Sequence, residues 1–343
     1  MTPTNRRERV DSRDLLHKAT SPRDGASAAD APSPEDWKVD VTSLRIESIH
    51  SHEVWDRSID PVLQVDPGTE VTLELRDASG GQITPEDESD AIGHLDFGRV
   101  NPCTGPIGVE GLEPGEGLVI TILEIAPATW SWTANIPGFG LLADDFPDAH
   151  LWISKVEGGR VQTPIGIDLA ARPMVGTIGV APATKGPHPI LVPGGHGGNM
   201  DICQLGAGAE LYLPVLVPDA LFSAGDAHAL QGDGEVCGTG AETASTIRVR
   251  LDRAGAPHKG TPWFLYDAAA LDTSFTVTTG IGPDLFDAAI EATRRGVEMV
   301  VARTGLAPVD AYLLLSLVGD LHVSEVVDAP NWVVSLHIPT RIL

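Results

Sequence analysis

The chain has few cysteines, no long apolar run and no serine-nucleophile motif, and each absence argues against a class of protein. Its three cysteines, Cys103, Cys203 and Cys237, are an odd number without disulfide-dense spacing, so we expect reduced thiols in a cytoplasmic protein. No apolar run approaches the ~20 residues that cross a membrane, and the Arg6-Arg7 pair is followed by no apolar signal core. The sequence contains no Gly-Xaa-Ser-Xaa-Gly elbow, so we do not expect a catalytic serine triad.

The charge balance is strongly acidic. Lys and Arg number 23 against 48 Asp and Glu, which gives a formal net charge of -25 and a pI near 4.6. Such a surface repels nucleic acid, anionic membranes and acidic substrates, whereas a small neutral molecule is not disfavoured. The sequence therefore predicts neither a nucleic-acid partner nor a membrane partner.

The composition favours turns and strands. The chain has 37 Gly and 27 Pro, spread among many short apolar runs. Three segments, residues 66–75, 113–122 and 206–215, each pass from a glycine turn into a strand with alternating apolar residues. We therefore predict a mainly β protein with β-sandwich or barrel subdomains built from repeated β units.

The pattern changes at both ends of this β-rich region. Residues 1–40 lack a sustained apolar period and predict a mobile N-terminal extension, while residues 41–260 form the β-rich domain that carries the site. Residues 283–303 read as a helix stopped by Gly305, a second helix runs from Pro308 to Leu317, and residues 332–338 form a last strand. Residues 261–343 are thus expected to be an α+β portion packed on the β domain.

One glycine-rich stretch, residues 225–235, contains the chemistry most typical of a site. It places Asp226, His228, Gln231, Asp233 and Glu235 between glycines that admit unusual backbone angles. Carboxylates with a neutral imidazole suit zinc and similar divalent cations. A solvated acidic turn would explain any one of these residues equally well, but five together favour a site.

A second glycine-rich stretch, residues 193–201, lies just upstream and carries His196, Asn199 and Asp201. If the two stretches flank paired strands, their polar side chains meet at one end of a sheet. His50 and His52, on one face of an expected strand, could add to a metal site, although surface strand histidines are common.

Two further segments could line a pocket. Asp96 stands between Leu95 and Phe97, which predicts a buried acid, paired with Arg99 or facing a ligand. Residues 130–132 and 137–142 contain aromatic and glycine residues that suit a pocket wall, core packing or a contact between subunits. Such exposed segments also predict a homo-oligomer.

These motifs together resemble the acetamidase/formamidase family of amide hydrolases from about His50 to the C-terminus. The resemblance rests on residues 196–201, 225–228 and 231–235, with 95–100, 104–111, 113–115 and 315–320 in the same order. It implies hydrolysis of short linear amides of the formamide or acetamide type to a carboxylate and ammonia, with a small neutral amide as the substrate.

Residue chemistry then suggests roles within the cluster. A bound divalent metal, zinc or alternatively calcium, would polarise the carbonyl and lower the pKa of bound water. The expected metal ligands are Asp201, Asp226, His228 and Asp233; the expected catalytic residues are Glu235 as the base and His196 as an oxyanion or orienting group; the expected substrate-binding residues are Asn199, Gln231 and Asp96.

Three rival interpretations remain open from the sequence. Cys237, two residues after Glu235, could act as a thiol nucleophile, although a cysteine in that context is more often a core residue. A non-catalytic β-sandwich module that binds calcium or a sugar would also use acidic glycine-rich loops. A cupin-like metal oxygenase is less favoured, because only His228 lies in the central cluster.

Overall fold

The computed structural model describes residues 44–255, 260–268 and 273–343. By its internal contacts the chain divides into two units, Met1–Thr42 and Ser43–Leu343. The expected N-terminal extension falls in the first unit, outside the described residues. Everything below concerns the second unit.

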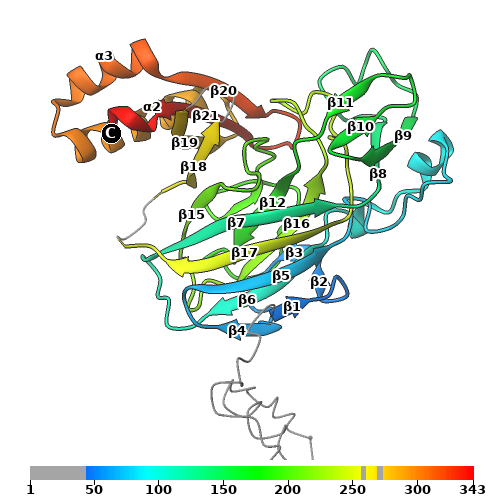
Figure 1. Ribbon diagram of the computed structural model, residues 1–343, viewed down its shortest axis with the longest axis horizontal. Helices are drawn as coiled ribbons and strands as arrows, with labels where there is room; N and C mark the ends of the chain where they lie inside the picture. The colour runs from blue at the N-terminus through cyan, green and yellow to red at the C-terminus, as the bar shows by residue number, and fades with distance from the viewer. Residues whose placement is uncertain (1–43, 256–259, 269–272) are drawn as a thin grey trace, which may run out of the picture. The chain divides into compact units, whose positions relative to one another are not determined.

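Within the described residues the regular structure is mostly β-strand, arranged in four sheets (Figure 1). The largest sheet has nine strands in the order β1 (Leu44–Ile46), β5 (Thr69–Leu75), β17 (Ser245–Arg253), β7 (Gly117–Pro127), β15 (Glu210–Pro214), β18 (Trp263–Ala268), β19 (Thr273–Gly282), β21 (Trp332–Pro339) and β20 (Asp320–Glu325). The expected mainly β fold is confirmed.

The remaining strands form three smaller sheets. The six-stranded sheet runs β14 (Gly197–Asn199), β12 (Met174–Val180), β16 (Phe222–His228), β6 (Cys103–Val109) and β2 (Ser51–His52), with β4 (Leu63–Val65) also paired to β6. The four-stranded sheet runs β11 (Asp168–Ala170), β10 (Arg160–Gln162), β9 (His150–Glu157) and β8 (Trp130–Asn135), and β13 (His188–Pro189) pairs with β3 (Val54–Trp55).

The main core lies where the nine-stranded and six-stranded sheets face each other. Strand β17 alternates in burial, so that Ile247, Val249 and Leu251 point inward and are fully buried. These side chains share one apolar cluster with Ile178 and Phe222 from the six-stranded sheet. Strands β6, β12 and β16 are buried along their whole length, as expected of an inner layer covered on both faces. A rigid sandwich therefore holds the strands that carry the site.

Two helices follow near the C-terminus, as predicted. Helix α2 (Leu285–Thr304) is capped by Asp284 and ends at Gly305, which adopts φ 74°, and α3 (Pro308–Val318) begins with proline. Three short 3-10 helices, η1 (Ser89–His94), η2 (Phe97–Arg99) and η4 (Thr340–Ile342), complete the elements described.

The expected boundary at residue 260 lies inside one sheet. Strand β18 pairs with β15 through Trp263 opposite Tyr212, and β19, β21 and β20 continue the sheet outward. By contact clustering, residues Ser43–Leu343 form one compact unit, and the α+β portion expected over residues 261–343 contains the two helices and the last strands of this sheet. No single helix in the described part of the chain passes a length and hydropathy test for crossing a membrane; α2 and α3 pass it only as a pair bent by 112°.

Candidate active site

Strand β12 brings the two glycine-rich stretches together. It pairs with β14 on one side and with β16 on the other, so that Thr177 lies opposite both Asn199 and Gly225. Asp226 and His228 are two residues apart on β16, and Asp201 follows β14. The two stretches therefore lie on strands that flank β12 on either side, which brings their polar side chains together.

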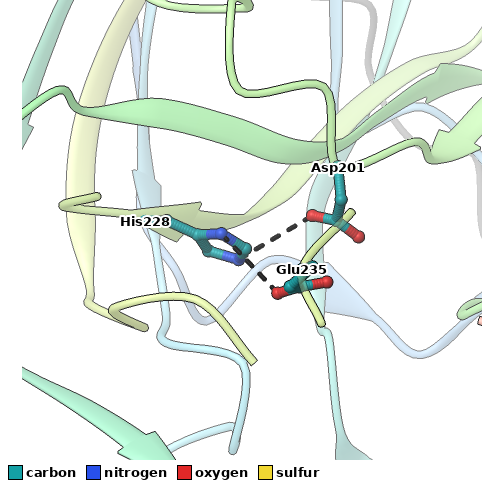
Figure 2. A group of neighbouring side chains, drawn as sticks. All are labelled: Asp201, His228 and Glu235. Carbon is teal, nitrogen blue, oxygen red and sulfur yellow. Dashed lines mark ion pairs between the residues drawn. The ribbon is translucent and has the colours of Figure 1, made fainter. Parts of the chain in front are cut away.

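The side chains converge on His228. Its Nε2 lies 2.9 Å from Glu242 Oε2, 3.2 Å from Asp226 Oδ1 and 3.8 Å from Asp201 Oδ1. Its Nδ1 lies 4.0 Å from Glu235 Oε1. Figure 2 shows Asp201 and Glu235 turned toward the imidazole. All five residues are buried, so the cluster is a site shielded from bulk water rather than a solvated acidic turn.

Gln231 fixes the orientation of this imidazole. Its Nε2 donates to the carbonyl oxygen of Asp201 at 2.6 Å, so its Oε1 faces His228 Nδ1 at 2.7 Å. An amide oxygen can only accept a hydrogen bond, so His228 Nδ1 carries the proton. Nε2, the other ring nitrogen, then faces three carboxylates, and it offers a lone pair to a cation when its own proton is displaced.

Burial of these acids disfavours their ionised forms. It raises the pKa of Asp201 and of Glu235 well above the ordinary carboxyl range, and neighbouring carboxylates add to the effect. Burial likewise raises the pKa of Glu242 to about 7. For His228 burial alone would lower the pKa, but Glu242 and Asp226 raise it well above its usual value. The cluster therefore has an excess of negative charge that favours protons or a cation.

The backbone at the site adopts an unusual conformation. Asn101, Asp201, Asp226 and Glu235 have φ between 43° and 52°, in the left-handed region that side chains other than glycine rarely adopt. Such conformations cost on the order of 1–3 kcal/mol each and concentrate at functional sites. The strain aims polar side chains that a relaxed strand would direct elsewhere.

Amides and a hydroxyl surround the cluster and hold it. Asp226 Oδ2 accepts from Asn101 Nδ2 at 2.8 Å and from Thr177 Oγ1 at 3.3 Å. Asn199 accepts from Thr177 and donates to Asp328. Burial raises the pKa of Asp328 to about 7. Asn199 thus joins two acidic groups and faces the same cavity.

The cavity beside the cluster has a volume of about 60 Å³. Its polar lining residues include Asn101, Asn199, Asp201, Asp226, Glu235, Glu242 and Asp328. The apolar part of the lining, called the apolar wall below, consists of Ala78, Leu95, Phe97, Val100, Trp132, Ile136, Phe139 and Leu191. A small molecule with one polar end and one apolar end fits this division.

Three predicted site residues lie apart from the cluster. Asp233 is exposed on the same loop, where its carboxylate accepts from His322 Nδ1 at 2.8 Å and from Cys203. It belongs to neither group of metal-compatible residues, so its expected role as a ligand is not supported by the geometry. The loop turns after Gln231, and its next backbone bond runs from Gly234 N to Ser324 O in β20 at 2.9 Å.

His196 and Asp96 also differ from expectation. His196 packs edge-to-face on Trp55 and does not line the cavity, and burial lowers its pKa to about 4. The predicted burial of Asp96 is wrong: its side chain is exposed and accepts from Gly98 N at 2.9 Å, which caps η2. The flanking Leu95 and Phe97, rather than Asp96, face the cavity.

Two important acids were missed from the sequence. Glu242 lies in a backbone bridge opposite both Trp132 and His228, and Asp328 follows β20. Glu242 follows Gly238 and Gly240, just past the glycine-rich stretch that ends at Glu235, whereas Asp328 has no glycine nearby; the structure reveals both through their neighbours. Cys237 is partly buried with Sγ 3.5 Å from the Thr239 carbonyl oxygen, and it is not among the cavity-lining residues.

The donor set fits a divalent cation. Two groups, Asp201–His228–Glu235 and Asp226–His228–Glu242, place their ligand atoms within 4.8 Å of one another. Asp201 Oδ1 and Glu242 Oε2 are buried without a hydrogen-bond partner. Buried carboxylate oxygens are costly when unpaired, and oxygen ligands with one imidazole suit zinc.

Comparisons with known proteins agree with this chemistry. A model of the acetamidase/formamidase family matches residues 38–191 and 185–343. The formamidase of Methylophilus methylotrophus is 28% identical over 372 residues, covering 85% of this chain and 89% of that protein. The acetamidase of Mycolicibacterium smegmatis is 29% identical over 274 residues, covering 61% and 67%. The crystal structure of an acetamidase from Bacillus halodurans superposes with a TM-score of 0.81 at 32% identity, covering 87% and 98%.

Proposed function

Because the chain belongs to the acetamidase/formamidase family, we propose that it hydrolyses short linear amides to a carboxylate and ammonia at the buried acid–imidazole cluster. The family makes the chain an amidohydrolase. The choice of amide, the metal and the roles of individual residues are the parts that we propose.

The proposed mechanism rests on one observation. His228 is held by Gln231 so that its free nitrogen faces the carboxylates of Glu242, Asp226 and Asp201. A hydrogen bond from the other ring nitrogen to an oxygen acceptor is the usual support of a metal-binding histidine. The arrangement matches a ligand set more closely than a set of paired charges, because Glu242 Oε2 lacks an aligned hydrogen bond.

We assign Asp201, Asp226, His228 and Glu242 to holding the cation and Glu235 to proton transfer. The imidazole ligand favours zinc over calcium, which prefers oxygen ligands alone. A bound zinc ion would polarise the amide carbonyl and lower the pKa of water toward ~7. Compared with the ligand set predicted from the sequence, our proposal exchanges Asp233 for Glu242 and keeps Asp201, Asp226 and His228.

Glu235 is placed to move the proton. Its carboxyl group is buried at the cavity, on the Nδ1 side of His228. It takes a proton from the water that attacks the carbonyl carbon, and it returns that proton to the nitrogen as the C–N bond breaks. Ammonia leaves and the carboxylate product remains. Burial raises the pKa of Glu235 well above the ordinary carboxyl range, which favours its holding the proton between the two steps.

The cavity restricts the substrate to small molecules. One water-sized group needs roughly 10–15 Å³ of such volume, so about 60 Å³ has room for only a few heavy atoms. Formamide and acetamide are of this size. Asn199, which faces the cavity, remains our candidate for binding the polar end of the amide.

The thiol mechanism and the non-catalytic module each require structural features that differ from those of the metal mechanism. A thiol mechanism needs Cys237 at the cavity, whereas Gly238 and Thr239 line it instead. A non-catalytic metal-binding or sugar-binding module would have no use for a base beside its ligands. Both rivals remain testable by the experiment that follows.

The test combines metal analysis with ammonia release. The purified protein is analysed for bound metal, then assayed with formamide and acetamide before and after chelator treatment and after zinc is restored. We expect turnover that falls on chelation and returns with zinc, and loss of turnover in Glu235→Gln. Metal binding without turnover in the untreated protein would support the non-catalytic module. Asp233→Asn is the matched control, because this acid of the same loop lies outside the cluster.

Two expectations from the sequence remain predictions. We propose a cytoplasmic homo-oligomer, for which exposed apolar side chains on α3, such as Tyr312, Leu313 and Leu317, offer a surface. Light scattering of the full chain after size exclusion measures the number of copies directly.

A further inference from the structure

We propose that Phe97 and Phe139 together set the length of the acyl chain that the site accepts. This inference rests on the proposed amide hydrolysis and concerns the apolar wall of the cavity. Neither residue is needed for the chemistry. Both come from segments far apart in the sequence, which meet at the apolar wall.

The two rings form one flat surface. Their centroids lie 5.3 Å apart with an interplanar angle of 8°, which is a stacked arrangement. Phe97 is 45% exposed, whereas Trp132 behind it on the same wall is 3% exposed. Phe97, and with it the stacked pair, therefore stands nearer to solvent than Trp132 does.

Hydrogen bonds from Gln82 fix the backbone next to Phe97. Gln82 holds the preceding residue at two points: its Oε1 accepts from Asp96 N at 2.8 Å, and its Nε2 donates to Asp96 O at 3.2 Å. The Asp96 side chain then caps the turn at Gly98. Asp96, expected from the sequence to bind substrate, instead positions its neighbour Phe97.

The loop that carries Phe139 packs against the loop that carries Glu235, the proposed base. Leu141 N donates to Val236 O at 3.0 Å. Gly140 has φ 82°, and a side chain there would lie 2.8 Å from Cys237 O, so the two backbones are in close contact. The backbone beside Phe139 is therefore tied to the segment that begins with Glu235.

The chemistry of the substrate follows from this arrangement. An amide whose carbonyl lies at His228 and Glu235 must direct its acyl group away from the acids, and the apolar wall offers it an apolar surface. A hydrogen or a methyl group fits in the small cavity. Each further methylene must displace or press on the stacked rings, so we infer a preference for one-carbon and two-carbon acyl groups.

The test is the acyl profile of variants at the two rings. Phe97→Ala, Phe139→Ala and the double variant are assayed with formamide, acetamide, propionamide and butyramide, and kcat/KM is compared as a ratio within each variant. Such ratios cancel any change of rate common to all four amides. One methylene in an apolar pocket is worth on the order of 10–200-fold. We expect the acetamide-to-butyramide ratio to fall at least about tenfold in Phe139→Ala and further in the double variant.

Phe146→Ala is the matched control, because Phe146 is 58% exposed and does not line the cavity. Its profile should equal that of the wild type. Phe139→Leu keeps apolar bulk and should give an intermediate ratio if the alanine variant unfolds. Unchanged profiles in all the ring variants, beside an active wild type, would overturn this inference alone. A wild type that releases ammonia from none of the four amides when loaded with zinc would overturn the proposed function, and this inference with it.

Discussion

Replacing Gln231 by methionine distinguishes the two roles this residue could have. The sequence suggested that it binds substrate, whereas in the structure its amide holds His228 Nδ1 and the Asp201 carbonyl oxygen. Methionine preserves the length and much of the volume of the side chain but removes both hydrogen bonds. The imidazole would then be free to rotate and to exchange tautomers.

The expected magnitude follows from this geometry. Loss of the partner of a metal-binding histidine typically weakens metal affinity 10–100-fold, which corresponds to about 1.4–2.7 kcal/mol. The buried carbonyl oxygen of Asp201 also loses its partner, which costs the metal-free fold about 1–3 kcal/mol. KM for the amide at saturating metal should stay near the wild-type value, because Gln231 does not line the cavity.

The assay is a competition titration of zinc against a fluorescent chelator, followed by steady-state kinetics at saturating zinc. Gln204→Met is the control: Gln204 donates to Asp233 at 3.3 Å, outside the cluster. An increased KM with unchanged zinc affinity in Gln231→Met would refute our reasoning and restore the role predicted from the sequence.

Three further predictions follow. Glu242→Gln should weaken the affinity for zinc more than Asp233→Asn does, because only Glu242 lies within 2.9 Å of His228 Nε2. Equal zinc affinities of the two variants in chelator competition would contradict the assignment of Glu242 as a ligand. Burial raises the pKa of Glu325 from 4.5 to about 8, so its proton stabilises the metal-free fold at low pH and this contribution is lost as the pH rises toward 8. Urea midpoints at pH 5 and pH 8 should therefore fall with pH in the wild type and differ less in Glu325→Gln; an undiminished difference would argue against this cause. Iodoacetamide and Cys237→Ala should leave ammonia release largely intact, whereas thiol-specific inactivation that Cys237→Ala abolishes would favour the thiol mechanism.

The fold class could be predicted because its signals are local. The alternation in residues 66–75 and 113–122 corresponds to β5 and β7, and the helix predicted over 283–303 is α2. The pairing of β15 with β18 leaves no mark on composition, so the sequence did not reveal that one sheet continues across residue 260. Edge-to-edge hydrogen bonds join segments regardless of their distance along the chain.

The site was predictable where its residues belong to the two glycine-rich stretches, because Asp201, Asp226, His228 and Glu235 are grouped there with other polar residues. Asp233 lies beyond the end of β16, where periodicity no longer fixes direction, and the loop turns it toward His322. Glu242 lies seven residues after Glu235, and only the backbone bridge to His228 shows that it returns to the cluster.

The backbone bond between the base-carrying loop and β20 ties the last quarter of the chain to the active site. Gly234 N donates to Ser324 O, so the strand at the edge of the large sheet anchors the turn from which Glu235 projects. A fragment ending near residue 260 would leave β15 with an unpaired edge, which is a template for aggregation, and would release the proton-transfer group from its anchor. Engineers who shorten or fuse this protein should therefore treat its C-terminal strands as part of the catalytic apparatus.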